Sequence, residues 1–200
     1  MSDIKINNIT DRTGDSGPIF AGISTVSTSA FMVMPSGPTE YRGGRGRGIF
    51  AGSYTPSSPN LSSSMDFVEI STLGNAVDFG DVSAARSGNP GLSGRTRAII
   101  GAGYGPSNQI MIVTMASQGD ATDFGNDVGN SNRATGVSNG TRGIFAGSSE
   151  LSPGNVIRYI TIDSLGDALD FGDLFQGSRS GLGGAASTTR GVFALSLIHI

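Results

Sequence analysis

The chain contains no cysteine and no tryptophan, and its 200 residues include a single histidine, His199, and a single lysine, Lys5. Without cysteine, the sequence excludes disulfides, cysteine-based zinc sites and thiol chemistry. Charged residues make up 14% of the chain, and a net charge of -3 gives no general attraction to nucleic acid or acidic membranes. No apolar run approaches the ~20 residues of a membrane-spanning helix, so membrane insertion is not expected. The polar start, residues 1–10, lacks the apolar region of a signal peptide.

A unit of about 47 residues recurs along the chain, and this period predicts an array of small supersecondary units. Its clearest marker reads Arg-Gly-Ile/Val-Phe-Ala, with one degenerate copy that reads Arg-Ala-Ile-Ile-Gly. The copies begin at Arg47, Arg97, Arg142 and Arg190, so successive spacings are 50, 45 and 48 residues. A second marker, Asp-Phe-Gly, keeps step with the first and occurs at Asp78–Asp81, Asp123–Gly125 and Asp170–Asp173.

Each unit is expected to contain at least three strands, and four are compatible with its length. A strand rich in β-branched and aromatic residues is predicted at Phe67–Ile70, Ile110–Met115 and Val156–Ile162. Polar and apolar residues alternate there with period two, which is typical of a strand and not of a helix. Gly74 and Gly166 follow, and we expect them to supply the positive φ of a tight turn. The Asp-Phe-Gly strand, a Ser/Gly/Arg loop and the Arg-Gly strand complete the unit.

The sequence therefore predicts an all-β fold of tandem sheets that are like the blades of a propeller. Propeller blades usually number about 4–8 and close a ring. Three intervals and an interrupted last unit cannot close one, so we expect an incomplete or open array. The repeat also predicts two sets of equivalent buried positions: Phe50, Ile100, Phe145 and Phe193, and then Phe79, Phe124 and Phe171.

Three segments are expected. Residues 1–46 form a short extended N-terminal module, in which Gly17–Gly22 echoes the repeat strand at a shortened spacing. Residues 47–194 form the repeat array, with about three repeats. Residues 195–200 break the pattern, because leucine replaces the glycine that follows the repeat strand in other copies. These six residues resemble the translated end of a sequencing adapter, and we expect them to be an artefactual tail on a truncated fragment.

Paired carboxylates are the candidates for metal binding. Calcium takes about 6–8 oxygen ligands, so two carboxylates with backbone carbonyls could begin such a site. Because the dense Asp-x-Asp-x-Asp-Gly spacing of a calcium loop is missing, capping of turns by the Asp side chains is the reading we favour. The candidates are Asp78 with Asp81, Asp120 with Asp123, and Asp170 with Asp173.

No motif in the chain marks a catalytic site. Asp-Phe-Gly is a metal motif of protein kinases, but a kinase also needs a Gly-rich loop, a strand lysine and a His-Arg-Asp loop. Arg42–Gly48 looks like an RNA-binding RGG segment, yet one short cluster in an acidic chain is better explained as a hinge. His199 lies in the expected tail and leaves no general base for a serine nucleophile. Glycoside hydrolysis by two carboxylates stays formally open, but every Asp pair recurs with the repeat, so we expect no enzymatic activity.

Two stretches resemble structural proteins of marine tailed bacteriophages, including cyanophage-type viruses. The first is INNITDRTGDSGPIFAGISTVSTSAFMVMPSG at Ile6–Gly37, which is similar to a leader that such proteins share ahead of varied C-terminal parts. The second is the iterated TRGIFAG and NVIRYITIDSLGDALDFGDL pattern within Thr141–Leu174. The length and strand content of the repeat also resemble Kelch repeats, although the repeat departs from the Kelch pattern in having no tryptophan.

The resemblance implies a non-enzymatic, virion-associated structural or adhesion protein. Residues 1–46 would attach to the particle, and the repeats would be displayed for weak multivalent binding. The expected partners are other virion proteins and a host surface glycan or receptor, with self-association into a homo-oligomer; no nucleic acid and no cofactor is expected. Two other classes stay open, namely an intracellular propeller-type scaffold for protein interactions and a polysaccharide depolymerase.

Overall fold

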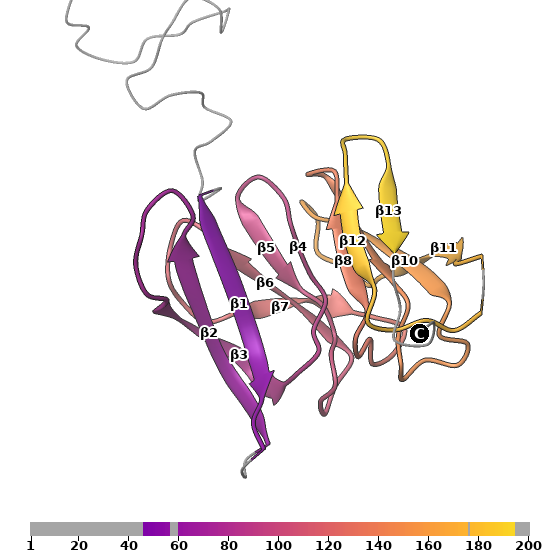
Figure 1. Ribbon diagram of the computed structural model, residues 1–200, viewed down its shortest axis with the longest axis horizontal. Coiled ribbons are helices and arrows are strands. Elements are labelled where there is room, and N and C mark those ends of the chain that lie inside the picture. The colour runs from indigo at the N-terminus through magenta and orange to yellow at the C-terminus, as the bar shows by residue number, and fades with distance from the viewer. Residues whose placement is uncertain (1–45, 57–59, 176, 195–200) are drawn as a thin grey trace, which may run out of the picture. The chain divides into compact units, whose positions relative to one another are not determined.

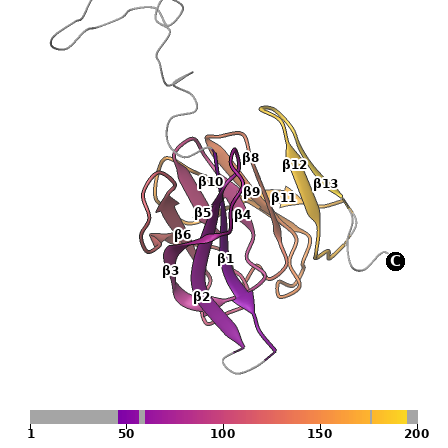
Figure 2. The same cartoon turned by 60° about the vertical axis from the view of Figure 1, so that its left-hand side comes forward.

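The computed structural model describes residues 46–56, 60–175 and 177–194, and throughout this part the chain forms strands and no helix (Figure 1 and Figure 2). The predicted all-β class is therefore confirmed. It follows that this part of the chain offers no helix able to cross a membrane. The predicted N-terminal module up to residue 45 and the predicted tail at 195–200 lie outside the described residues.

The strands form four antiparallel sheets, each a meander in which strands that follow one another in sequence are paired. The first sheet contains β1 (Arg47–Tyr54), β2 (Leu61–Glu69) and β3 (Val77–Arg86). The second contains β4 (Gly91–Ser93), β5 (Arg97–Ile100), β6 (Gln109–Thr114) and β7 (Thr122–Asn126). The third contains β8 (Thr135–Ser138), β9 (Arg142–Ala146), β10 (Val156–Thr161) and β11 (Leu169–Asp173). The fourth contains β12 (Gly183–Ala186) and β13 (Gly191–Ala194).

The sheets follow the repeat. The Arg-Gly marker becomes β1, β5, β9 and β13, and the Asp-Phe-Gly marker becomes β3, β7 and β11. The second and third sheets have a fourth strand, because β4 and β8 form in the stretch that the sequence assigns to a Ser/Gly/Arg loop. Glycine and serine have low strand propensity. The strands β4 and β8 therefore form because β5 and β9 pair with them, and they cannot be recognised from the sequence.

The hydrophobic core lies between neighbouring sheets, in two layers that share the second sheet. Adjacent residues of β5 face different layers, since Ile100 contributes to the first layer and Ile99 to the second. Burial on both faces explains why β6 is a nearly continuous apolar run. The first layer contains Met65, Phe67, Phe79, Val82, Ala98, Ile100, Met111, Val113 and Met115. The second contains Leu92, Ile99, Ile110, Ile112, Phe124, Phe145, Ile160, Ile162 and Ala168.

The predicted equivalence of the marker phenylalanines holds only where a neighbouring sheet is present. Phe145 is 0% exposed and Ile100 is buried, because both pack against the preceding sheet. The prediction is wrong for Phe50, which is 62% exposed. Phe50 occupies the same position in β1, but no strand among the described residues covers that face of the first sheet. The prediction is also not met by Phe193 in β13, which is only half-buried although β13 contacts β8 of the third sheet.

The Asp-Phe-Gly phenylalanines point the other way, toward the following sheet. Phe79 lies in the first core layer and Phe124 in the second, and both are buried as predicted. The prediction is wrong for Phe171, which is 51% exposed. The fourth sheet has only two described strands, and their main contacts with the third sheet are with β8, so Phe171 in β11 is only partly covered.

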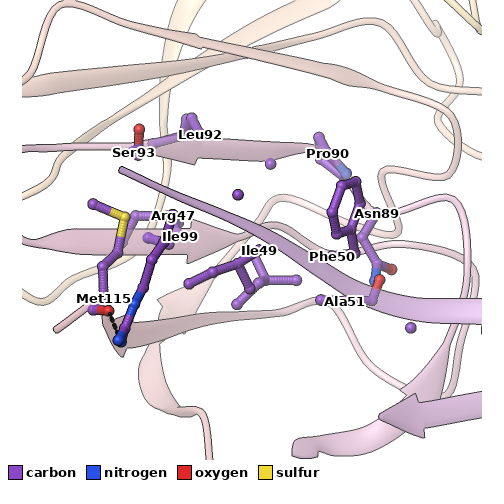
Figure 3. Close-up of a pocket in the computed structure, with 15 residues that line it drawn as sticks. Arg47, Ile49, Phe50, Ala51, Asn89, Pro90, Leu92, Ser93, Ile99 and Met115 are labelled. Atoms are coloured by element: carbon purple, nitrogen blue, oxygen red, sulfur yellow. Dashed lines mark hydrogen bonds between the residues drawn. The ribbon is translucent and has the colours of Figure 1, made fainter. Parts of the chain in front are cut away.

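The arginine that begins the Arg-Gly marker links adjacent sheets, which explains why it recurs in the repeat. Arg47 Nη1 donates to the carbonyl of Met115 at 2.9 Å (Figure 3), and Arg97 Nη1 donates to the carbonyl of Ile162 at 3.4 Å. Met115 and Ile162 are equivalent positions in successive units. Arg47 also lies 4.7 Å from the centre of the Phe67 ring in β2 of the same sheet, where a cation–π contact helps to hold the guanidinium in place.

The glycine turns are a second repeated link between sheets. Gly119 N donates to Phe79 O and Gly166 N donates to Phe124 O, both at 2.8 Å. Gly119 and Gly166 have φ values of 154° and 156°, so the prediction of positive φ is confirmed for Gly166. It is wrong for Gly74, whose φ is not positive. Among the described residues Gly74 has no preceding sheet to approach, and the distorted backbone is therefore not required there.

The glycine of Asp-Phe-Gly allows a close approach between sheets, which predicts a strong dependence on its partner. Gly125 has φ 149°, and a Cβ there would lie 2.3 Å from Gly166 O. Gly172 has a similar φ of 136°, but no described atom lies within 4 Å of its Cβ position. We expect both Gly→Ala changes to strain the backbone, and Gly125→Ala to lower the free energy of unfolding by about 1–3 kcal/mol more than Gly172→Ala. Urea unfolding of both variants measures the difference; equal losses would show that this inter-sheet contact does not form.

Candidate ligand-binding site

A pocket of about 550 Å³ is the strongest candidate site among the described residues. Its walls are the end of β1 and loops from three successive repeat units, and two of the chain's four tyrosines line it. A volume of this size and a few convergent polar groups are typical of sites for small ligands. The lining residues are Ser53, Tyr54, Ser87, Gly88, Tyr104, Asn132, Arg133 and Glu150.

Backbone hydrogen bonds hold these loops together. Ser87 and Tyr104 exchange two hydrogen bonds, with N···O distances of 3.0 and 2.7 Å. Arg133 N donates to Gly88 O at 3.0 Å, which ties a loop of the second repeat unit to one of the first. Asn132 O accepts a bond from Ser149 N at 2.9 Å. The pocket is thus built on paired backbone and does not depend on side-chain packing alone.

Arg133 has an unusual backbone conformation. Its φ is 58°, and it is the only residue other than glycine with positive φ in the part of the chain that the structure describes. Such a conformation costs about 1–3 kcal/mol and concentrates at binding and catalytic sites. Two hydrogen bonds retain it, since Arg133 N donates to Gly88 and Arg133 O accepts from Gly181 N at 2.8 Å. The result is an exposed arginine side chain at the edge of the pocket.

The side chains in the pocket combine flat apolar surfaces with hydrogen-bonding groups. Tyr54 is 65% exposed and Tyr104 is 50% exposed, which is unusual for large aromatic residues. Asn132 Nδ2 donates to Glu150 Oε1 at 3.2 Å, so the carboxylate is oriented toward the amide. Aromatic rings can stack on the C–H face of a sugar ring, while amide, carboxylate and guanidinium groups can bind its hydroxyls. The arrangement can therefore hold a saccharide.

Sequence reasoning did not identify this pocket. Its residues come from loops, and their convergence depends on inter-sheet packing that the sequence does not show. One signal was present, because Tyr54 and Tyr104 each stand seven residues after a marker arginine, Arg47 and Arg97. A tyrosine recurring at comparable places in a repeat is a sign of a shared surface.

The predicted calcium residues are all exposed, and they lie along sheet edges and turns. Asp81 Oδ1 accepts a bond from Ser63 Oγ at 3.1 Å, and Asp123 Oδ1 accepts one from Gln109 Nε2 at 3.0 Å. Asp170 Oδ1 accepts from Gly172 N at 3.2 Å, as in a turn. Asp78 takes part through its backbone carbonyl, which accepts a bond from Gln118 at 2.7 Å. The exposed residues are Asp78, Asp81, Asp120, Asp123, Asp170 and Asp173.

Asp120 has a structural role that recurs in the next unit. Its Oδ1 accepts a hydrogen bond from Asp81 N at 3.0 Å, across the gap between the first and second sheets. Asp167 does the same for Asn126 N at 2.8 Å between the second and third sheets. Within the described ranges, no three Asp, Glu, His or Cys side chains come together as metal ligands would. These carboxylates therefore support the inter-sheet turns.

A buried ion pair lies between the second and third sheets. Arg158 and Asp127 have fully buried side chains, and Arg158 Nε is 3.0 Å from Asp127 Oδ1. Ser131 Oγ binds both groups, since it donates to Asp127 Oδ2 and accepts from Arg158 Nη2 at 3.0 Å. Burial lowers the pKa of the Arg158 guanidinium, and the charge of Asp127 raises it. Because no solvent reaches the pair, we assign it to stability and not to ligand binding.

The corresponding place between the first and second sheets holds a different arginine. Arg86 is buried, and its Nη1 donates to Gln109 O at 2.9 Å. Arg158 Nη1 donates to Val156 O, which is the position equivalent to Gln109 in the next unit. Burial lowers the pKa of Arg86, and no carboxylate among the described residues forms an ion pair with it. The two guanidinium groups thus fill equivalent places from opposite sheets.

No model of a known protein family matches the sequence, and no curated protein matches it. A function for this protein is therefore inferred from the pocket and from the resemblance of its sequence motifs.

Proposed function

We propose that the protein is a virion-associated adhesion protein whose repeat loops bind a glycan of the host surface, without enzymatic activity. The observation that carries the proposal is the 550 Å³ pocket, in which Tyr54 and Tyr104 stand exposed beside Arg133, Asn132 and Glu150. The phage-like stretches at Ile6–Gly37 and Thr141–Leu174 support the virion part of the proposal. Loops repeated along an array would bind weakly one by one and gain strength through avidity.

We further propose that the sheets are blades of a Kelch-like propeller that is incomplete in this chain. The second and third sheets are four-stranded meanders, which is the usual blade topology. The short strands contact one another in succession, β4 with β8 and β8 with β12, as strands nearest a common axis would. An experimental structure of the complete natural gene product in which these strands do not surround one axis would contradict this proposal.

Glycan binding should depend on the two tyrosines. On a microarray of bacterial surface polysaccharides, we expect the protein to bind a subset of them. Tyr54→Ala and Tyr104→Ala should each lower the affinity by about tenfold, because each removes a stacking surface from the pocket. Phe175→Ala is the matched control, since Phe175 is an exposed aromatic residue outside the pocket and its loss should leave binding unchanged. Absence of binding, or equal effects of all three variants, would refute the glycan part.

The virion part is tested by mass spectrometry of purified phage particles. Peptides that cover Gly143–Arg158 should be present, since trypsin cleavage after Arg142 and after Arg158 releases this segment as one peptide. Particles that lack these peptides while infected cells contain them would favour an intracellular scaffold. Cleavage of a capsular polysaccharide that disappears on mutation of one Asp would instead identify a depolymerase.

A further inference from the structure

One position of the repeat has a left-handed backbone conformation in three successive units. The position comes three residues before the glycine of each short strand that pairs with the repeat strand. These glycines are Gly91 in β4, Gly136 in β8 and Gly184 in β12. The φ value at the position is 63° for Gly88, 58° for Arg133 and 66° for Gly181. The fold therefore requires a positive φ here, whichever residue the unit supplies.

The left-handed conformation belongs to a row of hydrogen bonds between units. Arg133 N donates to Gly88 O at 3.0 Å, and Gly181 N donates to Arg133 O at 2.8 Å. The same backbone atoms thus connect the first unit to the second and the second to the third. A glycine at position 133 would keep both bonds, because they use only main-chain atoms. The hydrogen bonds explain the backbone of Arg133, but they give no reason for its side chain.

Glycine is the residue that steric arguments favour at this position. A side chain in the left-handed region costs free energy because its Cβ approaches a carbonyl oxygen of the backbone, and glycine has no Cβ. At Gly88 packing also excludes a side chain, since a Cβ would lie 2.3 Å from Asn132 Oδ1. The residue at the place of Asn132 in the next unit is Ser180. Its shorter side chain leaves room for one at position 133.

Among residues with side chains, arginine is an unusual choice for positive φ. Asparagine and aspartate tolerate this conformation best, and asparagine would also supply an uncharged donor and acceptor for sugar hydroxyls. Arginine adds a permanent positive charge and a planar fork of N–H donors, which matches a carboxylate or another oxyanion. Residues that break a local rule concentrate at functional sites. The charge of Arg133 is therefore the property that glycine or asparagine could not supply.

The surroundings leave this charge available to a ligand. Arg133 lines the pocket and its side chain is exposed. It forms no ion pair with a carboxylate among the described residues. The acidic residue of the pocket wall, Glu150, instead accepts a hydrogen bond from Asn132 Nδ2 at 3.2 Å. A ligand that enters the pocket therefore meets a guanidinium that no described carboxylate neutralises.

We propose that the saccharide bound in this pocket is acidic, and that Arg133 binds its carboxylate, sulfate or phosphate group. This inference rests on the proposed glycan binding and names the class of glycan. Tyr54 and Tyr104 supply the stacking surfaces for the sugar rings. Arg133 selects acidic over neutral chains, because a charge-assisted hydrogen bond is about twice as strong as a neutral one. It is thus a specificity-determining residue.

The test compares the unchanged protein with Arg133→Gly, since glycine stands at the equivalent positions and fits the backbone without strain. On the microarray of bacterial surface polysaccharides, we expect the bound members to carry carboxylate, sulfate or phosphate groups. Arg133→Gly should lower the affinity for them at least about tenfold. Chemical removal of the acidic group, such as carboxyl reduction of a bound polysaccharide, should weaken binding to the unchanged protein by a similar factor.

Stability gives a second measurement, in which the expected change has the opposite sign. Arg133→Gly should raise the midpoint of urea unfolding by roughly 0.2–0.5 M, because it removes the left-handed strain. Arg95→Gly is the matched control, since Arg95 is an exposed arginine outside the pocket and its φ is not positive. This control removes the same charge and should leave binding unchanged. It should lower the midpoint, because glycine raises the conformational entropy of the unfolded chain.

The possible failures can be told apart. Bound polysaccharides without an acidic group, or acidic ones that bind Arg133→Gly as tightly as the unchanged protein, would overturn the role of Arg133 and leave glycan binding intact. A lower urea midpoint for Arg133→Gly would mean that the side chain has a structural role, which also contradicts the inference. If the unchanged protein binds no polysaccharide, the proposed function fails and this inference fails with it.

Discussion

Replacing Phe145 with alanine is expected to lower the free energy of unfolding by about 3–5 kcal/mol. Phe145 is fully buried in the core layer between the second and third sheets, so its removal loses apolar burial and leaves a cavity. A domain with a total stability of about 5–15 kcal/mol would be close to unfolding at ambient temperature. In urea, the transition midpoint should fall by roughly 1.5–2.5 M if the slope is about 2 kcal/mol/M.

The repeat supplies a control with the same chemistry. Phe50 has the same place in the marker, but it is 62% exposed, and Phe50→Ala is expected to cost less than about 1 kcal/mol. The two variants differ only in whether a neighbouring sheet covers the ring. A loss for Phe50→Ala as large as that for Phe145→Ala would mean that the outer face of the first sheet is covered in solution.

The buried ion pair is the second position where a large effect is expected. Asp127→Val and Arg158→Met should each lower the free energy of unfolding by about 3–5 kcal/mol, because each leaves the other charge buried without its partner. The double variant should lose less free energy of unfolding than either single variant. Val82 and Met111 occupy the equivalent positions of the preceding interface and are buried there, so this pair of apolar side chains fits between two sheets. Urea unfolding of all four proteins measures this coupling as a double-mutant cycle.

An exposed ion pair in the same protein provides the comparison. Arg47 Nε lies 2.6 Å from Glu69 Oε1, but their side chains are 22% and 41% exposed. The corresponding cycle with Glu69→Ala and Arg47→Met should give a coupling below about 1 kcal/mol. If the Arg158–Asp127 cycle gave a coupling as small as this, the pair would not be buried as the structure describes it.

The repeat made the main strands predictable, because β-branched and aromatic residues recur at fixed places in each unit. The predicted strand at Ile110–Met115 corresponds to β6, and that at Val156–Ile162 corresponds to β10. The short strands β4, β8 and β12 could not be predicted, since their glycine and serine residues form strands only when a neighbour pairs with them.

The errors at Phe50 and Phe171 have one cause. The repeat predicts equivalent positions, but burial also depends on a neighbouring sheet, and the neighbours differ at the two sides of the array. The ligand pocket was beyond sequence reasoning for a related reason. Tyr54, Tyr104 and Glu150 are in three different units, and only the stacking of sheets brings their loops together.

The buried guanidinium is supplied by the earlier sheet at one interface and by the later sheet at the next. This alternation limits which rearrangements of the gene the fold can tolerate. Loss of one repeat between Arg86 and Ser131 would bring Arg86 and Arg158 into a single buried site and remove Asp127, the only carboxylate that pairs with either of them among the described residues. Tandem duplication of the same repeat would place Asp127 against Met111, with no cation. Unequal recombination between similar gene segments would therefore produce junctions with uncompensated charge. The charged groups buried between sheets therefore restrict changes in the number and order of the repeats, even though the units have similar sequences.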